Sequence, residues 1–131
     1  MKTVTAAIIV EEGKILIARR APGEKLAGMW EFPGGKVEGE ETLVDCLTRE
    51  LREELGVSVS VGPIVAESVY EYPHGSIRLI ALRTRILAGT LSLTVHDQVD
   101  WVAPDNLLRY QLAPADIPIA IDILGEFGQA P

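Results

Sequence analysis

One predicted helix constrains the fold of this 131-residue chain more than any other segment. Between Gly35 and Val57 the residues read GKVEGEETLVDCLTRELREELGV, and leucines recur at every fourth position, at Leu43, Leu47, Leu51 and Leu55. Such a stripe predicts an amphipathic helix whose apolar face packs on a core. Thr42, followed by Asp45 three residues later, is the expected N-cap, and Gly56 is the expected end of the helix.

Three glutamates, Glu50, Glu53 and Glu54, lie beside this stripe within little more than one helical turn. At about 100° per residue, Glu53 and Glu54 fall on either side of Glu50, so all three share one arc. Like charges at this spacing destabilise a helix, and carboxylates at the edge of a core are costly unless paired. Because Mg²⁺ and Mn²⁺ prefer carboxylate oxygen, the cluster predicts a metal site rather than a solvated charged face.

Composition limits the class of protein. A hydrophobic content of 47% over 131 residues predicts one compact domain spanning residues 1–131. The net charge of −7 argues against a nucleic-acid polymer as partner, since such binding depends on basic surface. No signal peptide or membrane span is recognisable, and the single Cys46, expected to pack in the core, fits a reducing compartment. We therefore expect a cytoplasmic protein without a membrane partner.

The remaining patterns predict strands mixed with two separated helices. Strands are expected at residues 2–10, 14–20, 57–61, 64–72, 77–87 and 99–102, and a loop at 21–29. Pro33, Gly34 and Gly35 predict a tight turn where the backbone can approach a ligand closely. A second helix is expected from Asp116 or Pro118 onwards, because apolar residues recur there at helical spacing. Together these elements predict an α/β sandwich.

The segment around the glutamates resembles the Nudix box. The pattern G-x5-E-x7-R-E-U-x-E-E-x-G-U, with U aliphatic, is matched in full by Gly35, Glu41, Arg49, Glu50, Leu51, Glu53, Glu54, Gly56 and Val57. The likeness extends from Arg19 and Arg20 through WEFPGG at 30–35 to LAPADIP at 112–118. It covers nearly the whole chain and is most similar to MutT-type Nudix hydrolases, in particular bacterial CTP pyrophosphohydrolases. The resemblance implies an α/β/α sandwich with a mixed β-sheet.

The resemblance also implies a reaction and a set of site residues. The reaction would be Mg²⁺-dependent hydrolysis of a nucleoside triphosphate to monophosphate and pyrophosphate, with Mn²⁺ able to substitute. The implied metal ligands are the backbone carbonyl of Gly35 and the carboxylates of Glu50, Glu53 and Glu54. The implied catalytic residues are Glu50, as base or ligand, Glu53, Arg49 and Lys36. The implied substrate-binding residues are Arg20, Lys25, Glu31, Phe32, Pro33, Gly34 and Asp116.

Several of these roles have a structural alternative. Arg49 is spaced to orient Glu53 at i+4, or to tie Glu41 to the helix. Lys36 either contacts a phosphate or is a solvated lysine without a role in binding. Arg20 either contacts the substrate or is a charged residue on an edge strand. Arg19 and Lys25 would give a polyphosphate further local help.

One element of the MutT pattern is missing. A further metal-binding Glu commonly precedes a late-strand Trp by six residues, and here that position before Trp101 is Val95. Valine cannot coordinate a metal. Either Asp97 or Asp100 replaces it, or the protein holds fewer cations.

Base recognition is predicted to involve Asp116, which lies where the MutT pattern has a base-reading Asn. A carboxylate accepts hydrogen bonds only, and so suits an exocyclic amino group such as cytosine N4. The alternative is that Asp116 is the N-cap of the last helix. Trp30 and Phe32 either stack on the base or belong to the core.

The expected substrate is therefore (d)CTP or a modified cytosine nucleotide, a small molecule. One alternative is 8-oxo-dGTP, which Asp116 does not exclude. Another is ADP-ribose or a dinucleoside polyphosphate, because Pro73 stands 16 residues after Val57, a position that resembles ADP-ribose hydrolases, although MutT-type chains can share it. A non-catalytic Nudix-fold regulator is the alternative of another class. We expect a monomer or a homodimer.

Overall fold

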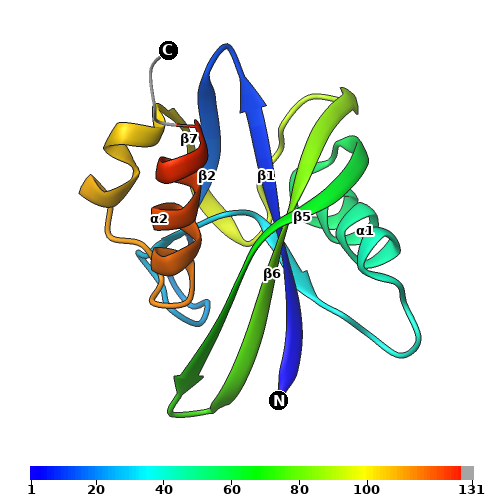
Figure 1. Ribbon diagram of the computed structural model, residues 1–131. Coiled ribbons are helices and arrows are strands. Elements are labelled where there is room, and N and C mark those ends of the chain that lie inside the picture. The colour runs from blue at the N-terminus through cyan, green and yellow to red at the C-terminus, as the bar shows by residue number, and fades with distance from the viewer. Residues whose placement is uncertain (128–131) are drawn as a thin grey trace.

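The computed structural model describes residues 1–127, in which a mixed β-sheet lies between two helices (Figure 1). The last four residues of the predicted domain, 128–131, lie outside the described residues. The strands are β1 (Lys2–Glu11), β2 (Lys14–Arg20), β3 (Trp30–Glu31), β4 (Gly34–Lys36), β5 (Ser58–Tyr72), β6 (Gly75–Ala88) and β7 (His96–Val102). The helices are α1 (Leu43–Leu55), the 3-10 helix η1 (Pro104–Arg109) and α2 (Asp116–Phe127).

The sheet is mixed because one central pairing is parallel. The strand order is β3-β2-β1-β6-β5, with β4 also paired to β1 and β7 to β2. Strands β1 and β6 run parallel, and the other pairs run antiparallel. Helix α1 covers one face of the sheet and α2 the other, as Figure 1 shows. The predicted α/β/α sandwich with a mixed sheet is confirmed.

Alternation along β1 divides the core between the two faces. Ala6 and Ile8 pack on the side of α2, whereas Ala7 and Ile9 pack on the side of α1. Successive side chains of a strand point to opposite faces, so one buried strand supplies both cores. The leucine stripe of α1 behaves as predicted: its last three members, Leu47, Leu51 and Leu55, are fully buried.

The ends of α1 also follow the sequence. The side-chain oxygen of Thr42 accepts a hydrogen bond from the Asp45 N–H at 3.0 Å. Gly56 ends the helix in the left-handed conformation, with φ of 70°. This conformation strains residues that carry a Cβ, which is why glycine stands at the stop.

Several strand predictions differ from the structure. Gly34 and Gly35 form the strand β4 against β1 rather than a tight turn, and the edge strand β3 and the helix η1 were not predicted. Strand β5 runs on through Gly62 and Pro63, which produce a register shift instead of a break. A proline and a bulge are tolerated there because β5 lies at the edge of the sheet. No helix within residues 1–127 is long and apolar enough to cross a membrane.

Candidate active site

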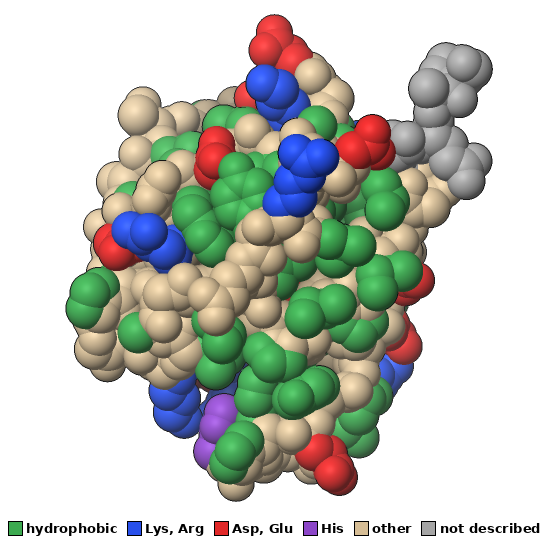
Figure 2. Space-filling model, turned by 90° about the vertical axis from the view of Figure 1, so that its left-hand side faces the viewer, with side chains coloured by type: hydrophobic (Ala, Val, Ile, Leu, Met, Phe, Trp, Pro, Cys, Tyr) green, Lys and Arg blue, Asp and Glu red, His purple; other side chains and the backbone are tan. Residues whose placement is uncertain are grey.

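A cavity of about 330 Å³ lies between the C-terminal half of α1, strand β4 and the start of α2. Figure 2 shows a hollow bordered by basic side chains and a histidine. Ten of the thirteen predicted site residues line the cavity: Arg20, Lys25, Glu31, Phe32, Gly34, Gly35, Lys36, Glu50, Glu54 and Asp116. The other three, Pro33, Arg49 and Glu53, lie outside it. The fold thus gathers residues from both ends of the chain around one space.

Gly35 and Glu50 are packed directly against each other. A Cβ at position 35 would overlap the carboxyl group of Glu50, so only glycine leaves room for this carboxylate. The Glu50 side chain is 13% exposed. Burial raises the pKa of this carboxyl, although the nearby Arg49 opposes the shift.

Glu54 carries the clearest sign of a missing positive partner. Its Oε1 atom is buried and has no hydrogen-bond partner among the described residues. Burial, followed by the charges of Glu50 and Glu31, raises the pKa of the Glu54 carboxyl to about 8. A divalent cation would supply the partner and remove the repulsion, so the residues fit such an ion.

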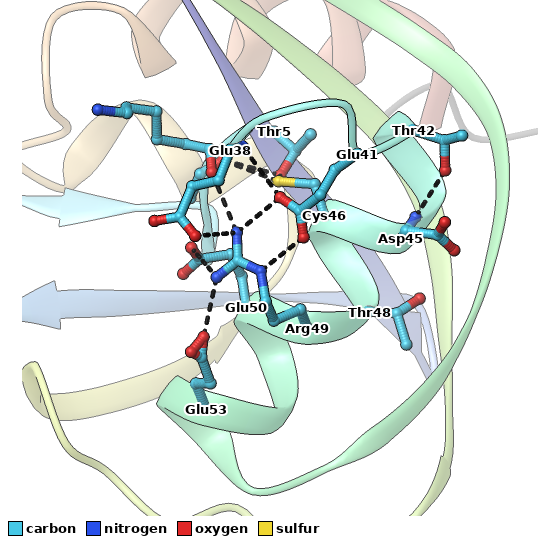
Figure 3. A network of polar contacts seen from close by, with 12 residues as sticks. Thr5, Glu38, Glu41, Thr42, Asp45, Cys46, Thr48, Arg49, Glu50 and Glu53 are labelled. Atoms are coloured by element: carbon cyan, nitrogen blue, oxygen red, sulfur yellow. Dashed lines mark hydrogen bonds and ion pairs between the residues drawn. The ribbon is translucent and has the colours of Figure 1, made fainter.

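The arginine of the box holds several carboxylates at once (Figure 3). Arg49 Nε lies 2.6 Å from Glu41 Oε2, and Arg49 Nη1 lies 2.9 Å from Glu50 Oε1 and 2.8 Å from Glu53 Oε1. The two alternatives for Arg49 are therefore both present in one network. The hydrogen bond from Arg49 lowers the pKa of Glu41 to about 2. Charge-assisted contacts of this kind fix the direction of each carboxylate.

Glu53 does not join its two neighbours at the cavity. Its side chain is 54% exposed and pairs with Arg49 (Figure 3). Within residues 1–127, no three Asp, Glu, His or Cys side chains converge closely enough to form a ready metal cage. The single arc predicted for the three glutamates is thus divided: Glu50 and Glu54 face the cavity, and Glu53 lies outside it.

The carbonyl of Gly35, the implied backbone ligand, is held by two buried groups. Thr5 Oγ1 donates a hydrogen bond to it at 3.0 Å, and Cys46 Sγ donates at 3.5 Å. Burial raises the pKa of the Cys46 thiol. Cys46 is fully buried, as predicted, and it also contacts the site.

Of the basic residues expected near the substrate, three line the cavity and Arg19 does not. Arg20 donates to Glu31 Oε2 at 3.1 Å and to the Lys25 carbonyl at 2.5 Å. Lys25 and Lys36 line the cavity with exposed side chains. Arg19, expected to help with a polyphosphate, does not line the cavity and instead pairs with Asp97 at 2.8 Å.

The two candidates for the missing fourth glutamate are both engaged elsewhere. Asp97 accepts hydrogen bonds from Arg19 Nε and Nη2, and Asp100 accepts one from the Tyr110 hydroxyl at 2.5 Å. Neither lines the cavity. Held in these contacts outside the cavity, neither aspartate is placed to replace the glutamate missing at Val95, and the alternative that fewer cations are bound stays a prediction. Besides Glu50 and Glu54, the carboxylates that line the cavity are Glu31 and Asp116.

Asp116 lies at the opposite side of the same cavity. Its residue is 6% exposed, and Oδ2 accepts a hydrogen bond at 3.0 Å from the Phe32 N–H, 84 residues away. Burial, then the charge of Glu31, raises the pKa of the Asp116 carboxyl. Asp116 is itself the first residue of α2, so the N-cap alternative does not describe it. Phe32 lines the cavity, whereas Trp30 packs in the core against Tyr110.

Sequence reasoning missed a wall of the cavity formed by the β5–β6 hairpin. Tyr72 and His74 line the cavity and stack with ring centroids 5.2 Å apart. The Tyr72 hydroxyl accepts a hydrogen bond at 3.0 Å from the Ala115 N–H and thereby fixes the segment before Asp116. Lys2 also lines the cavity. The sequence carries no local signal for these residues, because their spacing matches no binding pattern.

The fold and the cavity together define a class of enzyme that acts on phosphate groups, with carboxylates for a cation beside lysines for an anion. A family model described as "NUDIX domain" matches residues 1–122. The chain belongs to the Nudix family, as a nucleotide pyrophosphohydrolase. Nudix hydrolases generally use a divalent metal, usually Mg²⁺, and act on small nucleotide substrates.

Individual relatives agree with this assignment. The CTP pyrophosphohydrolase of Escherichia coli K12 is 46% identical over 91% of this chain and 88% of that protein. The 8-oxo-dGTP diphosphatase of Haemophilus influenzae is 41% identical over 94% of this chain and 91% of that protein. The solution structure of the E. coli ORF135 protein has a TM-score of 0.83 at 43% identity, covering 95% of this chain and 89% of that one.

Proposed function

We propose that this Nudix hydrolase is a Mg²⁺-dependent pyrophosphohydrolase of (d)CTP or modified cytosine nucleotides, releasing the monophosphate and pyrophosphate. The observation that carries the proposal is the position of Asp116, a buried carboxyl that opens onto the same cavity as Glu50 and Glu54. The similarity to a CTP pyrophosphohydrolase at 46% identity supports the same substrate.

The phosphates would occupy the end of the cavity formed by α1 and β4. Glu50, Glu54 and the Gly35 carbonyl would hold the cation there, with Glu53 close by on the next turn. When bound, the cation neutralises phosphate charge and lowers the pKa of a bound water. Mn²⁺ would substitute for Mg²⁺, since both prefer oxygen ligands.

The chain's own residues would then complete the reaction. Lys25 and Lys36 bring positive charge to the phosphates, on a protein whose net charge is −7. Glu50, which lines the cavity beside Glu54, is the candidate either to accept a proton from the attacking water or to bind the cation. Arg49 would fix its direction through the 2.9 Å contact.

The base would occupy the end formed by β3 and the start of α2. Phe32 contributes a ring to this wall, and Asp116 an acceptor for an exocyclic amino group. The same chemistry accepts the amino group of guanine. Activity on 8-oxo-dGTP is therefore the second candidate, favoured by the 41% identity to an 8-oxo-dGTP diphosphatase.

A panel of nucleotides tests the proposal. We expect pyrophosphate release from dCTP, 5-methyl-dCTP or 5-hydroxy-CTP at the highest kcat/KM, and none after removal of divalent metal. The comparison nucleotides are 8-oxo-dGTP, dUTP and ADP-ribose. A higher kcat/KM for 8-oxo-dGTP than for every cytosine nucleotide would overturn the base assignment and favour the second candidate.

A variant tests the role of Asp116 directly. Asp116→Ala should lower kcat/KM for dCTP by about tenfold or more. The kcat/KM for dUTP, which lacks the amino group, should stay within about threefold of the wild-type value. Asp122→Ala is the matched control, because Asp122 is exposed on the same helix. An equal loss for dCTP and dUTP in Asp116→Ala would contradict the proposed readout.

A further inference from the structure

Two donors from neighbouring strands converge on one oxygen of Glu31. His96 Nε2 lies 2.8 Å from Glu31 Oε2, and Arg20 Nη1 lies 3.1 Å from the same atom. Arg20 and His96 are paired residues of β2 and β7, so the sheet register sets both donors together. Glu31 itself lies on β3, the strand next to β2. The Oε2 atom is therefore held from two sides.

The other oxygen of Glu31 remains available to a ligand. Oε1 accepts no hydrogen bond from any residue in the described range 1–127, and unlike Glu54 Oε1 it is not fully buried. It is thus open to solvent, and Glu31 lines the cavity. The next residue, Phe32, donates its N–H to Asp116 Oδ2. In addition to burial, the charge of Glu31 raises the pKa of both Glu54 and Asp116, so Glu31 lies between the metal end and the base end of the cavity, and the next residue fixes the Asp116 carboxyl beside it.

His96 itself cannot touch a substrate. Its side chain is 0% exposed, and its Nδ1 atom is buried without a partner in the described part of the chain. The hydrogen bond to a carboxylate assigns the proton to Nε2. A buried imidazole with one unpaired nitrogen costs free energy that an apolar residue would avoid. The hydrogen bond from Nε2 to Glu31 therefore accounts for a polar side chain at this buried position.

We propose that His96 is a positioning residue for base selection, acting through Glu31. By holding Oε2, with Arg20, it directs Oε1 toward the exocyclic amino group of the base, beside Asp116. The inference rests on the proposed function, because it concerns the base end of that site. The competing explanation is that His96 only stabilises the sheet.

Kinetics on two nucleotides separate these explanations. His96→Leu should lower kcat/KM for dCTP by about tenfold, mainly by raising KM. The kcat/KM for dUTP should stay within about twofold of the wild-type value. His96→Gln, whose amide can donate from a position similar to Nε2, should recover dCTP to within about threefold of wild type. If His96 had only a structural role, His96→Leu would lower kcat/KM for both nucleotides equally, and this result would overturn the inference.

A double-mutant cycle tests whether His96 acts through Glu31. In a Glu31→Gln background, His96→Leu should change the dCTP to dUTP ratio by less than about twofold, because the carboxylate it positions is already gone. Full additivity of the two substitutions would contradict the inference. If wild-type enzyme hydrolyses neither nucleotide, the proposed function fails instead.

A measurement without turnover decides the inference in either case. The imidazole ¹⁵N resonances of His96 should shift when a nonhydrolysable dCTP analogue binds, and shift less with the dUTP analogue. Glu31→Gln should abolish this difference. Identical shifts with both analogues, or no shift with either, would overturn the proposal even if His96→Leu fails to fold.

Discussion

The Glu50 carboxyl group occupies the space that a side chain at position 35 would need. This contact joins the first glycine of the box to its central glutamate, although the two residues are 15 positions apart in the sequence. Because the Gly35 carbonyl also accepts hydrogen bonds from Thr5 and Cys46, the glycine cannot move away without disturbing buried groups. The glycine is needed for packing, as well as for access to its carbonyl.

Gly35→Ala should therefore displace Glu50 and lower kcat by about a hundredfold, because small misplacements of catalytic groups have effects of this size. Hydrolysis of dCTP is the measurement, with circular dichroism to verify the fold. Gly125→Ala is the control: a Cβ there meets nothing within 4 Å, and alanine favours the helix. Wild-type activity in Gly35→Ala would contradict the need for Glu50 at this position.

Arg49 should be irreplaceable by lysine. Its guanidinium contacts Glu41, Glu50 and Glu53 at 2.6–2.9 Å, and a single ammonium cannot reproduce this geometry. We expect Arg49→Lys to lose about tenfold in kcat and Arg49→Ala about a hundredfold, both with lowered Tm. The exposed Arg52→Ala should leave both unchanged. An active Arg49→Lys enzyme would mean that charge alone, without the fork, suffices.

Stability of the metal-free protein should fall as the pH rises. The pKa of Glu54 is raised to about 8 from its ordinary value of 4.5, mainly by burial. The folded state thus retains a proton that the unfolded state releases, and stability is lost between pH 4.5 and 8. Glu54→Gln should remove this loss and raise Tm by about 4 °C at pH 8, with little change at pH 4.5.

The measurement is thermal unfolding in a chelator, with the exposed Glu126→Gln as control. Added Mg²⁺ should raise the Tm of the wild type by more than that of Glu54→Gln, since the cation replaces the proton. Parallel Tm profiles for wild type and Glu54→Gln would contradict the burial of this carboxyl.

Glu41 should show the opposite pH dependence. Arg49 lowers its pKa to about 2 from 4.5, so its contribution to stability is present above pH 4.5 and lost as the pH falls toward 2. Glu41→Gln should therefore have a lower Tm than wild type at pH 7, and this difference should vanish near pH 2. Glu40→Gln, at the exposed neighbour, provides the comparison. A constant difference from pH 7 to 2 would exclude the Arg49 contact as its cause.

The sequence predicted much of the fold and part of the site because these depend on local spacing. Helix α1, from the Thr42 cap to the Gly56 stop, follows from residues within one or two turns of each other. The strand predicted at residues 2–10, observed as β1, follows from its content of Thr, Val and Ile, residues that favour strands. Strand β4 was mistaken for a turn, because pairing with β1 depends on a partner 30 residues away.

Which carboxylates face the cavity was decided by tertiary structure. Glu53 and Glu54 are adjacent in the sequence, yet Arg49 and solvent surround one and the cavity wall buries the other. Likewise, no spacing indicates that Asp116 would accept from Phe32, or His96 approach Glu31. Local periodicity determines which face of a helix or strand is apolar. Contacts between distant segments arise only when the sheet and helices pack, so the long-range partners of these polar groups were decided there.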